Sequence, residues 1–76
     1  MNKKRLFFDF LQKQNALQAY KQAFYTCHSR KLHSSEYYAL SIAFIWADTP
    51  EGHEYWKSLD EKWFNYFNSI KRKYHF

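Results

Sequence analysis

The sequence predicts an all-α protein, a small bundle of about four helices around an aromatic-rich core. Apolar residues recur at steps of three and four through most of the chain, and one glycine and one proline leave few places for tight turns. Three tryptophans, seven tyrosines and eight phenylalanines supply large apolar areas, although a single cysteine rules out an internal disulfide. Residues 1–76 are therefore expected to form a single helical domain.

The first two helices follow from their apolar periodicity. Residues 4–13 carry Leu6, Phe7, Phe10 and Leu11 on one side. Asn15 offers a cap for the second helix, which is expected to end near His28. Its inner stripe has heptad spacing and consists of Leu17, Tyr20, Phe24 and Cys27.

The third helix is expected to start at Ser35 or Glu36, after a polar loop over residues 30–35. Apolar side chains surround it on nearly every face, which is typical of a central helix packed by several neighbours. Asp48 ends it. A strand over residues 40–46 is the alternative interpretation, but no other segment resembles a partner strand.

The strongest helix start in the chain is at Thr49. Its hydroxyl can cap a helix, Pro50 suits the first helical position, and Glu51 and Glu54 favour the positive end of the helix dipole. One continuous fourth helix is expected from there, because an apolar stripe follows at steps of three and four: Trp56, Leu59, Trp63, Phe67, Ile70 and Tyr74.

Basic residues gather in three groups, and an up-and-down bundle would bring all three to one end as a basic pole. This pole could bind nucleic acid. The groups are Lys3, Lys4 and Arg5; Arg30 and Lys31; and Lys71, Arg72 and Lys73. An alternative of nearly equal weight is that the last two groups only complement the negative ends of their helices, which leaves the first group unexplained.

No catalytic or metal-binding pattern stands out, so we expect neither enzymatic activity nor a cofactor. Cys27, His28 and His33 match no familiar zinc spacing, and neighbours on a helix point about 100° apart. His53 is expected to brace the preceding loop. The longest apolar run falls short of the ~20 residues that cross a bilayer, and no export signal is evident. We therefore expect a cytoplasmic protein.

The segment from Trp46 to Trp56 has the pattern Trp-x-x-Thr-Pro-x-Gly-x-x-aromatic-Trp and resembles short bacteriophage and prophage proteins of uncharacterised function. Residues 10–11, 15–20 and 59–63 are also similar to such proteins. The resemblance implies a phage origin and no particular activity. We interpret the motif as a structural corner between two helices, with the two tryptophans bracketing the turn and packing together; its residues are Trp46, Thr49, Pro50, Gly52 and Trp56, followed by Trp63.

The leading functional hypothesis is a helical interaction protein, one by which a phage inhibits a host or anti-phage defence protein. Aromatic content beyond what a small core can bury favours protein interfaces or self-association. Four tyrosines beside the heptad stripes are the candidate contacts: Tyr25, Tyr38, Tyr55 and Tyr66. A nucleic-acid-binding protein that uses the basic pole, or a virion assembly accessory, is the alternative.

Overall fold

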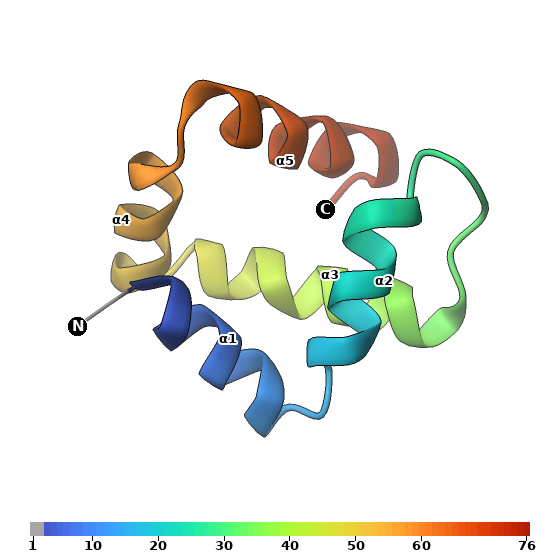
Figure 1. Ribbon diagram of the computed structural model, residues 1–76, viewed down its shortest axis with the longest axis horizontal. Helices are drawn as coiled ribbons and strands as arrows, with labels where there is room; N and C mark the ends of the chain where they lie inside the picture. The colour runs from blue at the N-terminus through green and yellow to red at the C-terminus, as the bar shows by residue number, and fades with distance from the viewer. Residues whose placement is uncertain (1–2) are drawn as a thin grey trace.

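The chain folds into five helices, and the computed structural model describes residues 3–76. In Figure 1, α3 runs through the middle, α2 packs across it, and α1, α4 and α5 surround the pair. The described part of the chain contains no strand, so residues 40–46 lie within a helix and the strand alternative is wrong. The helices are α1 (Lys3–Lys13), α2 (Leu17–Thr26), α3 (Ser34–Ala47), α4 (Pro50–Ser58) and α5 (Glu61–Tyr74).

The sequence predicts that Asn15 caps α2. In the structure, Asn15 instead ends α1. Its φ of 56° lies in the left-handed region, which asparagine tolerates better than most residues. The next amide, Ala16 N, then donates to Leu11 O at 2.8 Å, closing the last turn of α1. Because this turn reverses the chain, Ala16 is buried against the core.

The start of α3 is fixed by a buried carboxylate. Glu36 accepts two hydrogen bonds from the Arg30 guanidinium, at 2.8 and 2.6 Å, and a third from the His33 backbone amide at 2.8 Å. These bonds and the neighbouring positive charge lower the pKa of Glu36 to about 2. Arg30 therefore ties the loop after α2 to the first turn of α3.

The corner between α3 and α4 is built as the sequence predicts. The Thr49 hydroxyl donates to Trp46 O at 2.6 Å and accepts from Gly52 N at 3.1 Å, while Pro50 occupies the first turn of α4. Gly52 is required by space: a Cβ atom there would lie 1.9 Å from Trp46 O and 2.7 Å from Ala47 Cα. The two helices thus approach each other backbone to backbone.

The expected continuous fourth helix is instead two helices, α4 and α5, which run in clearly different directions in Figure 1. The break falls at Leu59 and Asp60, both in extended backbone conformation. Asp60 caps α5 by accepting a hydrogen bond from Trp63 N at 3.3 Å. The chain is therefore not an up-and-down bundle of four helices, although its all-helical class agrees with the prediction.

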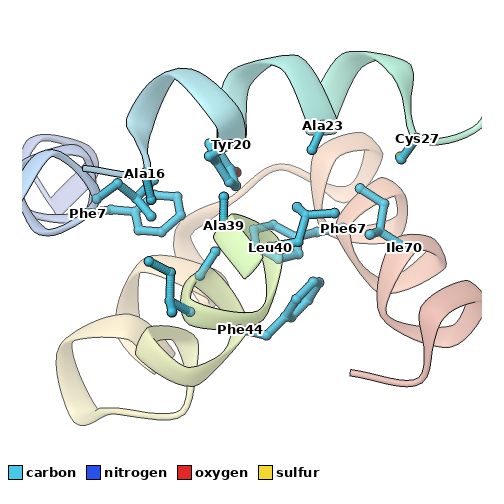
Figure 2. Packing of buried hydrophobic residues seen from close by; sticks show 13 residues of the cluster. Phe7, Ala16, Tyr20, Ala23, Cys27, Ala39, Leu40, Phe44, Phe67 and Ile70 are labelled. Carbon is cyan, nitrogen blue, oxygen red and sulfur yellow. The ribbon is translucent and has the colours of Figure 1, made fainter. Parts of the chain in front are cut away.

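One hydrophobic cluster links the helices, and its two halves are packed differently. Between α2 and α3 the buried positions include Ala23, Ala39 and Ala43, whose small side chains let the helices lie close together. Around α5 the contacts are made by large rings: Phe67 lies 4.6 Å from Phe44 and 4.0 Å from Trp56, centroid to centroid. Figure 2 shows Leu40, Phe67 and Ile70 on the side of α2 that carries Ala23 and Cys27.

Candidate functional site: a lysine-rimmed aromatic groove

A groove of about 760 Å³ opens between the first half of the chain and the α4–α5 segment. Its walls come from four helices: Phe8 of α1, Phe24 and Tyr25 of α2, Tyr55 of α4 and Trp63 of α5. Two of these rings are among the most exposed apolar side chains of the protein, since Tyr25 is 72% and Trp63 is 40% exposed. The groove therefore presents aromatic faces to solvent.

The wall rings are held in place by one another. Phe24 packs against Trp63 at a centroid distance of 5.9 Å with the rings stacked, and against Tyr25 at 5.5 Å with the rings edge to face. Tyr55 packs against Phe7 at 5.5 Å and is half-buried, and this burial raises the pKa of its hydroxyl. The groove is thus preorganised, because its rings are positioned by contacts within the protein.

The floor carries a polar atom without a partner. Tyr20 lines the groove and is only 6% exposed, and burial raises the pKa of its hydroxyl well above the usual range. Among residues 3–76 this hydroxyl has no hydrogen-bond partner, whereas the hydroxyl of nearby Tyr66 donates to Phe24 O. The ring of Tyr20 is buried but its oxygen remains open to solvent, so the hydroxyl can bind a polar atom of a ligand in the groove.

The rim is mostly positive. Lys3, Lys4 and Lys21 line the groove, and the ammonium groups of Lys4 and Lys21 lie 5.6 and 5.8 Å from the centre of the Phe8 ring. Asp60 is the single acid in the lining, and its carboxylate caps α5. An apolar ligand that bears negative charge at its edges would complement this surface.

Of the four tyrosines predicted as contacts, Tyr25 and Tyr55 are brought together in the groove, whereas Tyr38 and Tyr66 are not part of its lining. Tyr25 is exposed in the groove, whereas Tyr38 is exposed on α3 and belongs to another face. The expected exposure is wrong for Tyr55 and Tyr66, which are both half-buried. Tyr66 packs on Phe24 and lies 3.9 Å from the Cys27 sulfur, and burial together with this contact raises its pKa to about 12.

The predicted basic pole does not form, because the first basic group lies away from the other two. Lys3 makes an ion pair of 2.7 Å with Glu54 of α4, which lowers the pKa of Glu54 and places Lys3 beside α4. The ends of α2 and α5 do meet: Lys73 Nζ donates to Cys27 O at 2.9 Å. Lys73 therefore bonds the end of α2 and not that of its own helix, and Arg30 binds Glu36 at the start of α3, so neither contact is the one that the alternative interpretation predicts.

Four further residues of the predicted basic groups are exposed and have no ion pair within residues 3–76. They are Arg5 on α1, Lys31 in the loop before α3, and Lys71 and Arg72 on α5. The predicted nucleic-acid contacts are therefore divided between α1 and the region where the ends of α2 and α5 meet.

Most residues of the predicted motif are structural. The exception is Trp63, and the expected packing between Trp46 and Trp56 needs correction. Trp46 and Trp56 do not pack together: Trp46 stacks on Phe7 at 4.9 Å, whereas Trp56 packs on Phe67. Trp46 therefore contacts α1, whereas Trp56 contacts α5. Trp63, predicted as part of the motif, belongs to the groove instead.

Sequence reasoning missed the groove, whose further residues are Phe8, Tyr20, Lys21 and Leu59. A sequence signal did exist in the lysines placed next to aromatic stripes, Lys4 before Phe8 and Lys21 after Tyr20. These segments are far apart in the chain, so only the fold shows that they face each other.

Comparisons with protein-family models, with curated proteins and with solved structures find no match to this chain. Within residues 3–76, no helix combines the length and apolar character needed to cross a membrane. The same residues contain no group of three or more histidines, cysteines, aspartates or glutamates that could hold a metal ion.

Proposed function

We propose that this protein is a small helical interaction protein that holds an apolar segment of a partner protein in the aromatic groove. The observation that carries the proposal is the groove itself: the solvent-facing rings of Tyr25 and Trp63 line it together with Tyr20, whose hydroxyl has no hydrogen-bond partner among residues 3–76 and is open to solvent. Tyrosine and tryptophan are the residue types most often found as energetic anchors of protein interfaces.

The shape and charge of the groove favour an amphipathic helix as the occupant. An apolar helical face laid in a hydrophobic groove is a common mode of recognition, and its anchors recur every three to four residues. Lys3, Lys4 and Lys21 stand along the rim, so acidic residues flanking that apolar face would be favourable. Lys21 contributes most to this preference, because Lys3 already binds Glu54.

The biological part of the proposal follows the resemblance of the Trp46–Trp56 segment to short phage proteins. A protein of this size can act by occupying a surface that a host or anti-phage defence protein needs. In this proposal inhibition is steric, and it requires no reaction at the groove.

The test is affinity capture from bacterial lysate, with and without nuclease, using three forms of the protein. The groove variant combines Tyr25→Ser with Trp63→Ser, both exposed positions; the matched control is Tyr38→Ser on α3. A partner that survives nuclease, binds wild type and Tyr38→Ser equally, and is lost by the groove variant supports the proposal.

Two outcomes would overturn it. Recovery that disappears with nuclease would replace the proposal with the nucleic-acid alternative. A partner retained by the groove variant would show that binding uses another surface. Circular dichroism of all three forms ensures that lost capture reflects the groove and not unfolding.

A recovered partner allows a sharper measurement of the charge preference. The partner's groove-binding segment is made as a peptide and titrated against wild type and Lys21→Gln. We expect Lys21→Gln to bind about threefold to tenfold more weakly at low salt, with the difference shrinking as salt is added. Equal affinity for both forms would remove the acidic flank from the proposal while leaving the apolar contact intact.

A further inference from the structure

Helix α3 leaves one face uncovered by the rest of the protein. The residues on this face follow each other at steps of four, three and four, and they are Ser34, Tyr38, Ser41 and Ile45. Tyr38 is 54% and Ile45 is 65% exposed, so two large side chains stand in solvent with a small one between them. The Ser41 hydroxyl is directed back to its own helix, donating to Tyr38 O at 2.9 Å.

This face also carries no charge, although the protein has a formal net charge of +5. The single charged residue of α3 is Glu36, which is buried and paired with Arg30. Two copies of a strongly positive protein repel each other over most approaches, but here the apolar surfaces can meet without facing like charges.

We infer that a second copy of this chain covers the face, through an antiparallel, twofold-symmetric contact between the two α3 helices. The stripe is self-complementary in that arrangement: Tyr38 of each copy lies opposite Ile45 of the other, and the two Ser41 residues lie near the axis, where their small size allows close approach. This surface is separate from the groove, so the groove stays open in the pair.

Charges at the two ends of α3 favour the antiparallel direction. Asp48 follows the last residue of the helix, and Lys31 lies three residues before its first. When two α3 helices run in opposite directions, Asp48 of one copy lies near Lys31 and the positive helix end of the other. A parallel pair would instead place Asp48 beside Asp48 and Lys31 beside Lys31.

The contact is small, and a weak affinity is therefore expected. Helix α3 has 14 residues, about 21 Å of length. An interface built on one such helix pair falls at the low end of specific contacts, for which a Kd on the order of 10 μM to 1 mM is reasonable.

Sedimentation equilibrium between about 10 μM and 1 mM protein tests the association. Wild type should show a reversible dimer, and Ile45→Asp should weaken it at least tenfold because it buries a charge opposite Tyr38. Tyr25→Asp adds the same charge at an exposed groove position and should dimerise like wild type. A monomeric wild type at all concentrations, or equal dimerisation of Ile45→Asp, would overturn the inference.

Cross-linking tests the geometry. Under mild oxidation, Ser41→Cys should form a disulfide-linked dimer, because two copies bring residue 41 together near the axis. Gln18→Cys, exposed on α2, is the matched control and should remain unlinked; native Cys27 is 0% exposed and adds little background. Equal linking of both variants would show random collision and overturn the proposed contact, and circular dichroism verifies that each variant is folded.

Discussion

The α2–α3 side of this protein and the α5 side bury apolar surface in opposite ways. On the first, alanines at positions 23, 39 and 43 let two helices approach closely. On the second, rings of Phe44, Trp56 and Phe67 hold α5 away from the others. Large aromatic rings leave gaps between α5 and the other helices, and the groove opens beside these rings.

The largest loss of stability is expected at Gly52, where the backbones of α3 and α4 approach most closely. Gly52→Ala places a methyl group within 1.9 Å of Trp46 O, and the atoms in its way are backbone, which cannot move aside. We expect a loss of about 3 kcal/mol or more in the free energy of unfolding. Urea denaturation followed by circular dichroism measures it.

Lys57→Ala, at an exposed position of α4, is the control for Gly52→Ala and should change stability by less than about 0.5 kcal/mol. A Gly52→Ala protein as stable as wild type would mean that α3 and α4 are not packed backbone to backbone. The close-packed half of the comparison would then fail.

A second, smaller loss of stability is expected when a larger side chain is introduced. It should differ between the α2–α3 side and the α5 side. Ala39→Leu enlarges a fully buried position facing α2 and should cost about 1–3 kcal/mol, because the helices must separate. Leu59→Phe enlarges a half-buried position that lines the groove and should cost less than about 1 kcal/mol, because the added atoms enter open space. Similar losses in urea denaturation would contradict the difference in packing.

The smallest effect is expected at the ion pair between Arg30 and Glu36, which links the loop after α2 to the start of α3. The pKa of Glu36 is about 2 in the folded protein against 4.5 ordinarily, so the folded state binds its proton less readily than the unfolded chain. The stabilisation is fully present above about pH 4.5 and is lost as the pH falls toward 2. Glu36→Gln should therefore lower stability at neutral pH and flatten the decline between pH 5 and pH 2.

Glu51→Gln supplies the matched control for the acid titration, since Glu51 is exposed at the first turn of α4. It should decline with pH as wild type does. If Glu36→Gln declines as steeply as wild type, then Arg30 does not stabilise the start of α3 through this carboxylate.

The parts of the fold that sequence reasoning predicts are those with local signals. Thr49, Pro50 and Gly52 specify the α3–α4 corner through a cap, a fixed φ and a missing side chain, all within four residues. The central position of α3 is also predicted correctly, because a helix with apolar residues on nearly every face has to be buried on most of them.

The break at Leu59 and Asp60 was missed because the apolar stripe continues through it without losing register. The stripe outweighed the local signal of an aspartate cap followed by Glu61 in the first turn of α5. The groove was missed for a different reason. Its residues belong to four helices, and their meeting depends on the direction α5 takes after that break.

Cys27 gives the protein an internal reporter of its own motion. The Cys27 thiol is fully buried beside Tyr66. The backbone carbonyl of Cys27 accepts hydrogen bonds from Lys73 and Tyr74, so the end of α5 covers this residue. A thiol reagent can reach the sulfur only when this covering segment lifts or the whole chain unfolds. Labelling in the native state that is faster than global unfolding would therefore measure how often the end of α5 lifts from α2.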